Sequence, residues 1–435
     1  MIREADGVLE WRGGLAPGHA RSGGTLAIAG VSCEELAAQY GTPLLVLDYD
    51  LLDGIVAFFR SVCEPHGVEV SYAAKALLVV SLARRLKATP VGLEVCSLGE
   101  IVTAERAGFP SDRMQLHGCG KSDEEIGAAL DGRVGCIVVD NRDELERLAV
   151  RAADRMVKVL LRVNTAIEAP AHASVRTTGT VAKFGFDADD FDSAIARLQQ
   201  VPALRFAGLH AHVGSQISEA GVFVQNARSL MERAAKLHRA GIACERIVVG
   251  GGFGVQMDPL RAADFNLHDT ISAVAQAVRG EADRNQIATP RVGIEPGRAL
   301  IAHCGTSLYR IVAVKRSFGV RFAIVDGSLA DNPRPALYGA YHHIVLASRE
   351  PLHSVETVVC GRSCENDVLG RAMLATDLRA GDTIALCTTG AYTYSMASNY
   401  NLFRRPPIAA VSAGRHNLVA RRETEDDLLR KDCNA

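Results

Sequence analysis

The stretch VEVSYAAKALLVVSLARRL, residues 68–86, places a single lysine, Lys75, between two different hydrophobic patterns. Its first half is an apolar run typical of a buried strand, and its second half carries apolar residues at helical spacing. A lysine at such a junction is most often a solvated surface charge, because a long side chain at a strand end readily reaches water. The remaining sequence decides between that interpretation and a functional one.

The strand-then-helix pattern recurs along the chain. The segments between the β-rich runs, such as residues 122–133 and 142–155, begin near Ser or Asp and have helical apolar spacing. About eight such units over roughly 230 residues predict a (β/α)8 barrel of the TIM type. The runs are VEVSYAAKA (68–76), GLEVCS (92–97), MQLHG (114–118), CIVVD (136–140), KVLLRVN (158–164), FAGLHAHV (206–213), RIVVGGG (246–252) and RVGIEPGR (291–298).

A barrel also predicts where a site would lie. Barrel enzymes build their active sites from residues at the carboxyl ends of the strands. Nearly all of these positions carry a polar side chain or a glycine suited to ligand contact: Lys75, Ser97, His117, Asp140, Asn164, His212, Gly250–Gly252, Glu295 and Arg298.

Beyond Leu300 the chain changes to β-rich segments without long helical partners. They alternate apolar and polar residues and are separated by turns, which predicts an antiparallel sheet. We expect the run TLAIAGVS (25–32) to add a strand to it and the tail, residues 421–435, to be a charged, frayed end. The predicted architecture is a barrel over residues 48–300 with a second, antiparallel β domain formed by residues 1–47 and 301–435.

Composition narrows the class of partner. The 435 residues carry a formal net charge of −2, which gives no electrostatic sign of nucleic acid or of an anionic membrane. No apolar run has transmembrane length, and MIREADGVLEWRGG lacks the core of a signal peptide. The eleven cysteines are scattered without a C-x-x-C pair, which argues against a disulfide framework and a structural zinc site. We therefore expect a cytoplasmic protein that binds a small molecule and no metal.

Glycines and a lysine suggest the chemistry. GGGFG (250–254) and Gly297-Arg298 end neighbouring strands, where backbone N–H groups and a guanidinium can approach one phosphate. Each glycine motif alone is explained equally well by a tight turn. Together with Lys75 and Glu295 they are the components of a pyridoxal phosphate site, in which the lysine forms the Schiff base and the acid pairs with the pyridine nitrogen. His212 is placed to lie against the ring, with a satisfied core histidine as the alternative.

The chain resembles the fold-type III, alanine racemase-like pyridoxal phosphate decarboxylases, and the diaminopimelate decarboxylase family in particular. The resemblance extends in family order from Tyr72 to Asn401. It is carried by the motifs SYAAKA, HGCGKS, LRVN, TGTVAKFGF, HAHVGSQ, VVGGGFG, EPGR, RPALYGAYH, SCEND and GAYTYSMASNYN.

This resemblance implies a homodimeric decarboxylase with pyridoxal 5'-phosphate as cofactor. It makes Lys75 the Schiff-base lysine, Glu295 the partner of the pyridine nitrogen and His212 the residue stacked on the ring. Cys364 and Glu365 match the pair that the partner subunit inserts, with Cys364 protonating the carbanion left by CO2, and the β domain is expected to reach the site across the subunit boundary. Around the cofactor phosphate it places Ser215, Gly251, Gly252, Gly297, Arg298 and Tyr392; around the substrate it places Arg298, Arg334, Tyr338, Glu365 and Tyr392.

Three departures from the family pattern leave the substrate open. K-A-N is replaced by Lys75-Ala76-Leu77, D-V-V-S-G-G-E by LEVCSLGE, and C-E-S-G-D by the shorter Cys364-Glu365-Asn366-Asp367. Because the last change lies beside the substrate, we consider two substrates: meso-diaminopimelate, giving L-lysine, and a carboxylate-bearing amino-acid precursor of a siderophore or antibiotic pathway. A racemase is a weaker alternative, because racemases of this fold place an arginine where this chain has Glu295. A non-catalytic cofactor-binding protein is also weaker, because such proteins resemble the barrel alone.

Overall fold

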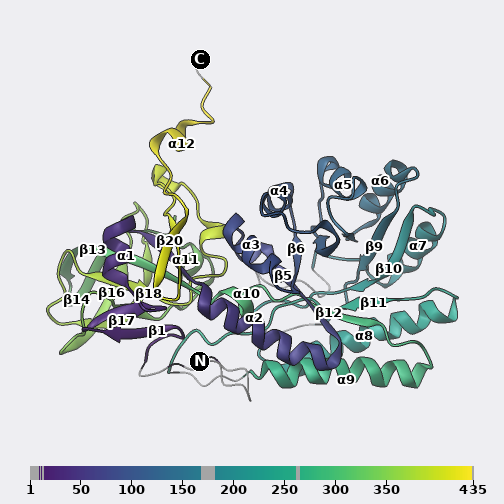
Figure 1. The fold of residues 1–435 in the computed structure, drawn as a ribbon, viewed down its shortest axis with the longest axis horizontal. Coiled ribbons are helices and arrows are strands. Elements are labelled where there is room, and N and C mark those ends of the chain that lie inside the picture. Colours follow the sequence, from purple (N-terminus) through teal and green to yellow (C-terminus); the bar gives the residue numbers. More distant parts are fainter. Residues whose placement is uncertain (1–8, 10, 12–13, 168–181, 261–264, 434–435) are drawn as a thin grey trace.

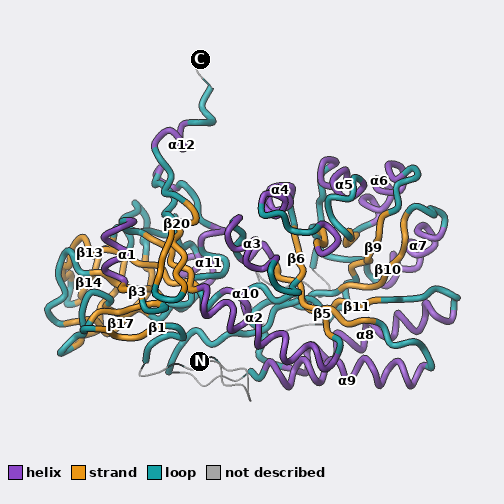
Figure 2. The backbone as a smooth tube through the Cα atoms, in the orientation of Figure 1, coloured by secondary structure: helices purple, strands orange, loops and turns teal. Residues whose placement is uncertain are grey.

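The computed structural model describes residues 9, 11, 14–167, 182–260 and 265–433. Figure 1 shows two bodies side by side, one surrounded by helices α4 to α9 and one built mainly from β13 to β20. The same division is clear in Figure 2, where strands dominate the second body. The chain crosses between the bodies at β4 (Leu44–Asp48) and α2 (Tyr49–Cys63), and again after α10 (Arg298–Ile301).

The first body is a closed parallel barrel with the strand order β10-β11-β12-β5-β6-β7-β8-β9. All eight β-rich runs predicted between residues 68 and 298 contribute a strand, so the barrel prediction is confirmed. The strands are β5 (Val68–Ala73), β6 (Gly92–Val95), β7 (Met114–Leu116), β8 (Cys136–Val139), β9 (Val157–Arg162), β10 (Leu204–His210), β11 (Arg246–Val248) and β12 (Arg291–Ile294).

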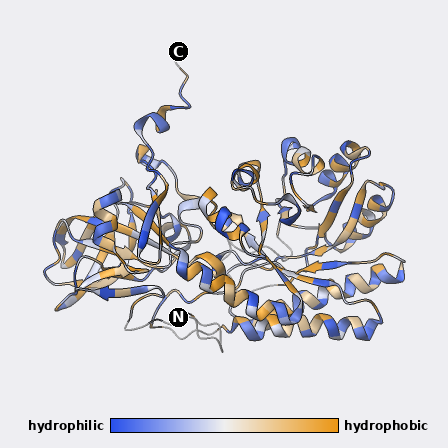
Figure 3. Cartoon of the chain, viewed as in Figure 1, coloured by the Kyte–Doolittle hydropathy of each residue, from blue (hydrophilic) through white to orange (hydrophobic). Residues whose placement is uncertain are grey.

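Helices alternate with these strands and begin at polar caps. Ser122 and Glu125 form a reciprocal capping box at the start of α5, and Asn141 accepts the N–H of Glu144 at the start of α6. Figure 3 shows hydrophobic and hydrophilic residues alternating around α8 and α9, as expected of helices with one buried face. The helices are α3 (Val80–Lys87), α4 (Leu98–Arg106), α5 (Asp123–Leu130), α6 (Arg142–Ala152), α7 (Ala188–Gln199), α8 (Ala220–Arg239) and α9 (Leu267–Asn285).

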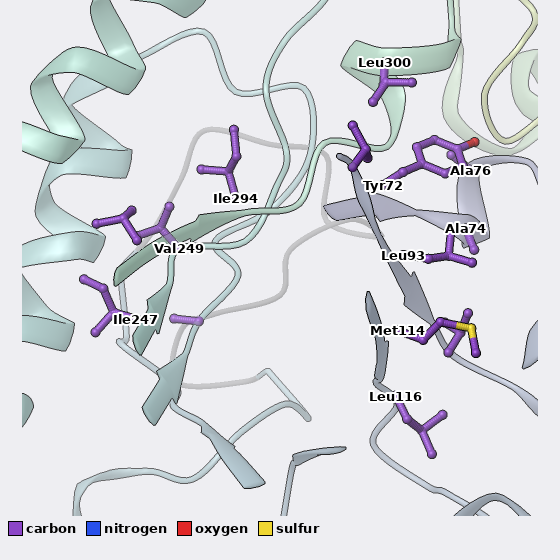
Figure 4. Packing of buried hydrophobic residues seen from close by; sticks show 14 of the residues in the cluster. Tyr72, Ala74, Ala76, Leu93, Met114, Leu116, Ile247, Val249, Ile294 and Leu300 are labelled. Carbon is purple, nitrogen blue, oxygen red and sulfur yellow. The ribbon is translucent and has the colours of Figure 1, made fainter. Parts of the chain in front are cut away.

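The strands separate an apolar outer layer from a largely polar interior, because successive side chains point to opposite faces. Figure 4 shows Ile247 and Val249 pointing from their strand toward the helices. Val248, between them, belongs instead to a small buried cluster with Cys136, Val138 and Leu160. This cluster is the apolar layer of the barrel interior, and polar residues lie on either side of it along the strands.

The second body is a sheet with the order β17-β16-β14-β13-β4-β19-β20, to which β15 and β18 are attached. Most of its strand pairs are antiparallel, as predicted, whereas β14 with β16 and β4 with β19 are parallel. Its remaining elements are β13 (Gly305–Ser317), β14 (Val320–Val325), α11 (Arg334–Tyr338), β15 (Ile344–Leu346), β16 (Ser354–Cys360), β17 (Val368–Ala375), β18 (Thr383–Leu386), β19 (Ile408–Ser412) and β20 (Arg415–Ala420).

Two terminal predictions were wrong in detail. TLAIAGVS forms β2 (Thr25–Ile28) and β3 (Val31–Ser32), which pair with each other and with β1 (His19–Ser22) in a separate three-stranded sheet before α1 (Cys33–Tyr40). The turn at Ala29 and Gly30, both with positive φ, folds this run back on itself, so it does not join the large sheet. In the tail, Thr424 and Asp427 cap α12 (Glu425–Leu429), so that part of the tail is helical and not frayed. Across the described ranges, no helix has the length and hydrophobicity needed to cross a membrane.

Candidate active site

Lys75 lies just beyond β5, in the single 3-10 turn Ala74–Ala76. Its ammonium Nζ donates to Oε1 of Glu94 at 2.6 Å, and Glu94 is a buried residue of the neighbouring strand β6. Desolvation disfavours the charged lysine, but the adjacent Glu94 outweighs it and raises the pKa of Lys75 above its usual range. The lysine is therefore held as an ammonium ion at the carboxyl end of the barrel.

Glu295 follows β12 and lies between two buried histidines. Nε2 of His210 donates to Oε2 of Glu295 at 2.9 Å, and Nε2 of His117 lies 3.2 Å from Oε1. Burial opposes ionisation of this carboxyl, but His117 and His210 hold its pKa well below the usual range. Burial also lowers the pKa of His210 to about 4, so His210 acts as a neutral donor to a carboxylate.

His117 links this carboxylate to the acid that holds the lysine. Its Nδ1 lies 3.9 Å from Oε1 of Glu94, while its other ring nitrogen faces Glu295. Ligand atoms of His117, His210 and Glu295 all lie within 4.8 Å of one another, a spacing that a metal ion could also use. From the sequence we expected no metal site, and this cluster of possible metal ligands was not predicted. We assign it to the cofactor site because Lys75 and a glycine-rich loop lie at the same end of the barrel.

The glycine-rich loop packs directly against its neighbours. A Cβ added to Gly251 would lie 2.0 Å from the carbonyl oxygen of Glu295, and one added to Gly252 would lie 2.1 Å from that of Gly214. The N–H of Gly251 donates to Nδ1 of His212 at 3.1 Å, which leaves Nε2 as the protonated nitrogen of a neutral ring. Burial, with a contribution from Lys75, holds the pKa of His212 well below its usual range. Only glycine fits this loop, and its packing sets the orientation of the imidazole.

Arg298 joins two other predicted residues at the same end. Its Nη2 donates to Oγ of Ser215 at 3.2 Å, and its guanidinium carbon lies 4.9 Å from the centre of the Tyr392 ring. The Tyr392 N–H donates to the carbonyl of Ala76 at 2.8 Å, directly beside Lys75. The β domain therefore contributes to the barrel mouth of its own chain. The expected contribution of Cys364 and Glu365 across a subunit boundary is separate from this contact and stays a prediction.

A second guanidinium adjoins Arg298. Arg334 is buried on α11, 5.9 Å from the Tyr338 ring centre; burial, aided by the positive charge of Arg298, lowers its pKa to about 10. Nε of each arginine is buried without a hydrogen-bond partner, and within the described part of the chain neither arginine pairs with a carboxylate. Two adjacent buried cations without an acidic partner are suited to bind an anionic group.

Cys364 and Glu365 lie elsewhere, on an exposed loop of the β domain. The Cys364 N–H donates to Oδ1 of Asn401 at 3.1 Å, and the Tyr400 hydroxyl donates to Oε1 of Glu365 at 2.6 Å. Among the contacts described, none joins this pair to Lys75 or Arg334. The chain by itself therefore brings together the predicted cofactor residues and the arginines, but not the cysteine and its neighbour.

The residues at the barrel mouth fit pyridoxal phosphate. Oε1 of Glu295 is buried, and its 3.2 Å contact with Nε2 of His117 lacks hydrogen-bond geometry, so it is available to a pyridine N–H. A Cβ on Gly297 would lie 3.1 Å from the Tyr392 hydroxyl, so glycine keeps this approach open beside Arg298 and Ser215. Lys75 offers an amine of the kind that can bond covalently to such a cofactor.

Sequence reasoning missed two residues of this site, Glu94 and His210. His210 ends β10 and lies two residues before His212 on the same inward face, and Glu94 is the charged side chain of β6, three residues before Ser97. Two residues that were predicted at the barrel mouth have other contacts. Ser97 accepts a hydrogen bond from the N–H of Glu100 and so caps α4, and Asp140 lies 3.7 Å from the buried Arg162. The first four residues of TGTVAKFGF, 178–181, fall outside the described residues.

Comparison with known proteins agrees with this geometry. The family model described as "Pyridoxal-dependent decarboxylase, pyridoxal binding domain" matches residues 55–302. A diaminopimelate decarboxylase of Actinosynnema pretiosum is 40% identical over 94% of this chain and 93% of its own, and that of Bacillus subtilis is 36% identical over 94% and 95%. The crystal structure of diaminopimelate decarboxylase from M. jannaschii superimposes with a TM-score of 0.90 at 27% identity, covering 96% of this chain and 98% of that chain. A second structure of the M. jannaschii enzyme, in complex with L-lysine, gives a TM-score of 0.87 at 28% identity, covering 96% and 98%.

The chain belongs to the family of pyridoxal-dependent decarboxylases. It is an enzyme of the carboxy-lyase class, and its cofactor is pyridoxal 5'-phosphate.

Proposed function

We propose that this enzyme converts meso-2,6-diaminopimelate to L-lysine and CO2. The observation that carries the proposal is the pair of buried guanidinium groups, Arg298 and Arg334, which have no acidic partner among the described residues. A carboxylate at the end of the substrate that does not react would neutralise both, and arginine can bind it through two parallel hydrogen bonds. The names of the similar curated enzymes and the lysine bound to one structural neighbour support the same substrate.

The cofactor would be held by residues from both bodies of the chain. Lys75 would form its covalent link, Glu295 would pair with its pyridine nitrogen, and His212 would lie against its ring. Its phosphate would be held by backbone and side-chain donors at the ends of neighbouring strands and on the β-domain loop: Ser215, Gly251, Gly252, Gly297, Arg298 and Tyr392. When bound, pyridoxal phosphate supplies the electron sink that accepts the electron pair of the breaking C–CO2 bond.

The residues around Lys75 and Glu295 would set the protonation states of the lysine amine and of the cofactor's pyridine nitrogen. Nζ of Lys75 must lose a proton before it can bond to a carbonyl carbon, and Oε1 of Glu94, at 2.6 Å, is the nearest base. The ionised Glu295 would keep a proton on the pyridine nitrogen of the cofactor, because a buried carboxylate favours a positive charge next to it. His212 stays neutral and so adds no positive charge on the face of the ring.

Decarboxylation must end with a proton delivered to the carbon that lost CO2. We assign this proton to the partner subunit's Cys364, with the partner subunit's Glu365 beside it, in a homodimer with shared sites. A thiol is a suitable acid because its pKa lies near working pH. The contacts of this loop with Tyr400 and Asn401 support the assignment, since they hold it on the exposed surface of the β domain. Tyr338 completes the substrate pocket beside Arg334.

The proposal extends to the organisation of the chain. We propose residues 48–300 as the cofactor-binding barrel and residues 1–47 and 301–435 as the domain that completes the site. We also propose that the enzyme acts in the cytoplasm, where its eleven cysteines remain reduced.

A substrate panel tests the proposed reaction. Release of CO2 is measured with meso-diaminopimelate, lysine, ornithine, glutamate and citryl amino acids, and the values of kcat/KM are compared. We expect meso-diaminopimelate to be preferred, with L-lysine as the product. Preference for lysine or ornithine would contradict the carboxylate-binding role of the arginines. Preference for a citryl amino acid would instead identify a decarboxylase of a siderophore-type pathway, which the shortened Cys364-Glu365-Asn366-Asp367 loop would then explain.

A further inference from the structure

A second cavity, of about 790 Å³, lies at the opposite end of the barrel from the cofactor site. Its walls come from the amino-terminal parts of the strands, among them Glu69 of β5, Gln115 of β7, Lys158 of β9 and Arg246 of β11. Lys75 and the other cofactor residues follow the carboxyl ends of these strands. The two sites therefore occupy opposite ends of the barrel axis.

The cavity exists because the barrel lining is small at this end. Ser71, Gly92, Cys136 and Ala207 lie along it, at a level where such barrels usually carry bulky branched side chains. A Cβ added to Gly92 would lie 2.8 Å from Oγ of Ser71, so even alanine fits poorly there. The opening is thus a consequence of the residues present and not of one mobile side chain.

A polar floor and an apolar layer separate this cavity from the catalytic end. Nη1 of Arg246 reaches across the barrel to Oε1 of Gln115 at 2.9 Å, and Nε2 of Gln115 donates to Oγ of Ser71 at 2.9 Å. The buried cluster of Cys136, Val138, Leu160 and Val248 follows along the barrel axis, and two of its members, Cys136 and Leu160, line the cavity. A molecule in the cavity would not touch Lys75 or Glu295.

The charges around the cavity favour an anion. Glu64 is paired with Arg60 at 3.1 Å, and Glu69 is shared between Arg246 at 2.8 Å and Arg291 at 2.9 Å. Lys158 lines the cavity and makes no ion pair with any residue that the structure describes. The lining has five basic and three acidic residues: Arg60, Arg113, Lys158, Arg246 and Arg291 against Glu64, Glu69 and Asp112.

One side of the cavity is apolar, formed by Val56, Phe59 and Val68. The volume lies within the range of about 300–1,000 Å³ that is typical of small-molecule sites, which also combine apolar walls with a few polar groups. We propose that this cavity binds a small organic anion, with a carboxylate or phosphate head at Lys158 and Arg246 and an apolar body against Val56, Phe59 and Val68. This site is separate from the proposed decarboxylation and does not depend on the identity of the substrate.

Calorimetric titration of the cofactor-loaded enzyme tests the site, after borohydride reduction has fixed the cofactor at Lys75. The probes are benzoate and phenyl phosphate, which share the anionic head and apolar body, with benzyl alcohol as the neutral analogue. We expect one of the two anions to bind once per chain and Lys158→Met to weaken it at least about tenfold, the effect of losing one charge-assisted hydrogen bond. The preferred anion identifies the head group as carboxylate or phosphate.

Two matched variants locate the binding. Lys236→Met removes an exposed lysine of α8 that pairs with Asp192, and Arg334→Lys alters the anion site at the barrel mouth. Binding should be unchanged in both. The proposal is overturned by equal binding of benzyl alcohol, by unchanged affinity in Lys158→Met, by loss of binding in Arg334→Lys, or by no binding of either anion at millimolar concentration.

Discussion

Replacing His210 with leucine tests what keeps Glu295 charged inside the barrel. The substitution removes the Nε2–H that donates to Oε2 of Glu295 at 2.9 Å. Both side chains are buried, so water cannot take the place of the lost donor. His117 remains 3.2 Å from the other carboxylate oxygen, so Glu295 loses part of its stabilisation and not all of it.

A hydrogen bond to a charged group contributes about 1.5–3 kcal/mol, and 1.36 kcal/mol corresponds to one pKa unit, so the pKa of Glu295 should rise by about one to two units. A carboxyl with a lowered pKa stabilises the fold above its unfolded pKa, and this stabilisation is lost as pH falls through the folded value. In His210→Leu the acidic limb of the pH profile should therefore move to higher pH. Activity near pH 8 should change little, since Glu295 is still ionised there.

The assay is kcat/KM from pH 5 to 9, together with urea unfolding at pH 8 and pH 5. The free energy of unfolding should fall by about 1.5–3 kcal/mol at pH 8 and by about as much at pH 5, because a carboxyl whose pKa starts well below its usual range is still ionised there after this rise. His210→Gln places an amide N–H near the position of the lost Nε2–H and should restore much of the wild-type profile. His303→Gln is the control, because His303 is another buried histidine whose pKa burial lowers to about 4, and its described contacts are with Thr388 and Trp11. An unshifted acidic limb in folded, cofactor-loaded His210→Leu would refute the reasoning, as would an equal shift in His303→Gln.

Three further predictions concern the proposed roles of single residues. Lys75→Ala should remove the visible absorbance of covalently held cofactor and abolish CO2 release; a band that persists after borohydride treatment and dialysis would place the covalent link elsewhere. Arg334→Lys should raise KM for meso-diaminopimelate by about 10- to 100-fold with a smaller effect on kcat, because one bidentate contact is lost, and an unchanged KM would remove Arg334 from the substrate pocket. Mixing Lys75→Ala with Cys364→Ala under conditions of subunit exchange should restore up to about half of the activity per mixed dimer, since one of two sites is then intact. No recovery despite demonstrated exchange would place both residues in one subunit's site or leave Cys364 without a catalytic role.

The barrel could be predicted from the sequence because each of its units repeats a local signal. A β-rich run, a polar helix cap and apolar residues at helical spacing identify a unit without knowledge of its neighbours. Lys75 and Glu295 could be assigned for the same reason, since the carboxyl end of a strand is visible in sequence. Glu94 and His210 lie earlier, within their strands, where a polar residue is easily interpreted as a core residue with a satisfied hydrogen bond.

Contacts between the two bodies could not be predicted in this way. Tyr392 has a positive φ and its N–H bonds to Ala76, while Ser395 donates to the same carbonyl across 319 residues of sequence. No periodic sequence pattern predicts such a contact, because it depends on how the β domain packs against the barrel. The resemblance to a known family placed both Arg298 and Arg334 at the substrate, whereas their adjacency depends on how the β domain packs against the barrel.

The polar interior at the catalytic end is a connected set of charges, which has consequences for how substitutions combine. Glu94 binds Lys75 at 2.6 Å and lies 3.9 Å from His117, which in turn lies 3.2 Å from Glu295. All of these side chains except Lys75 are buried, so water screens their interactions weakly. A change at Glu94 should therefore alter the ionisation of Glu295 through His117. Effects of paired substitutions along this set are expected to be non-additive, whereas Lys158, beyond the apolar layer, should combine additively with each of them.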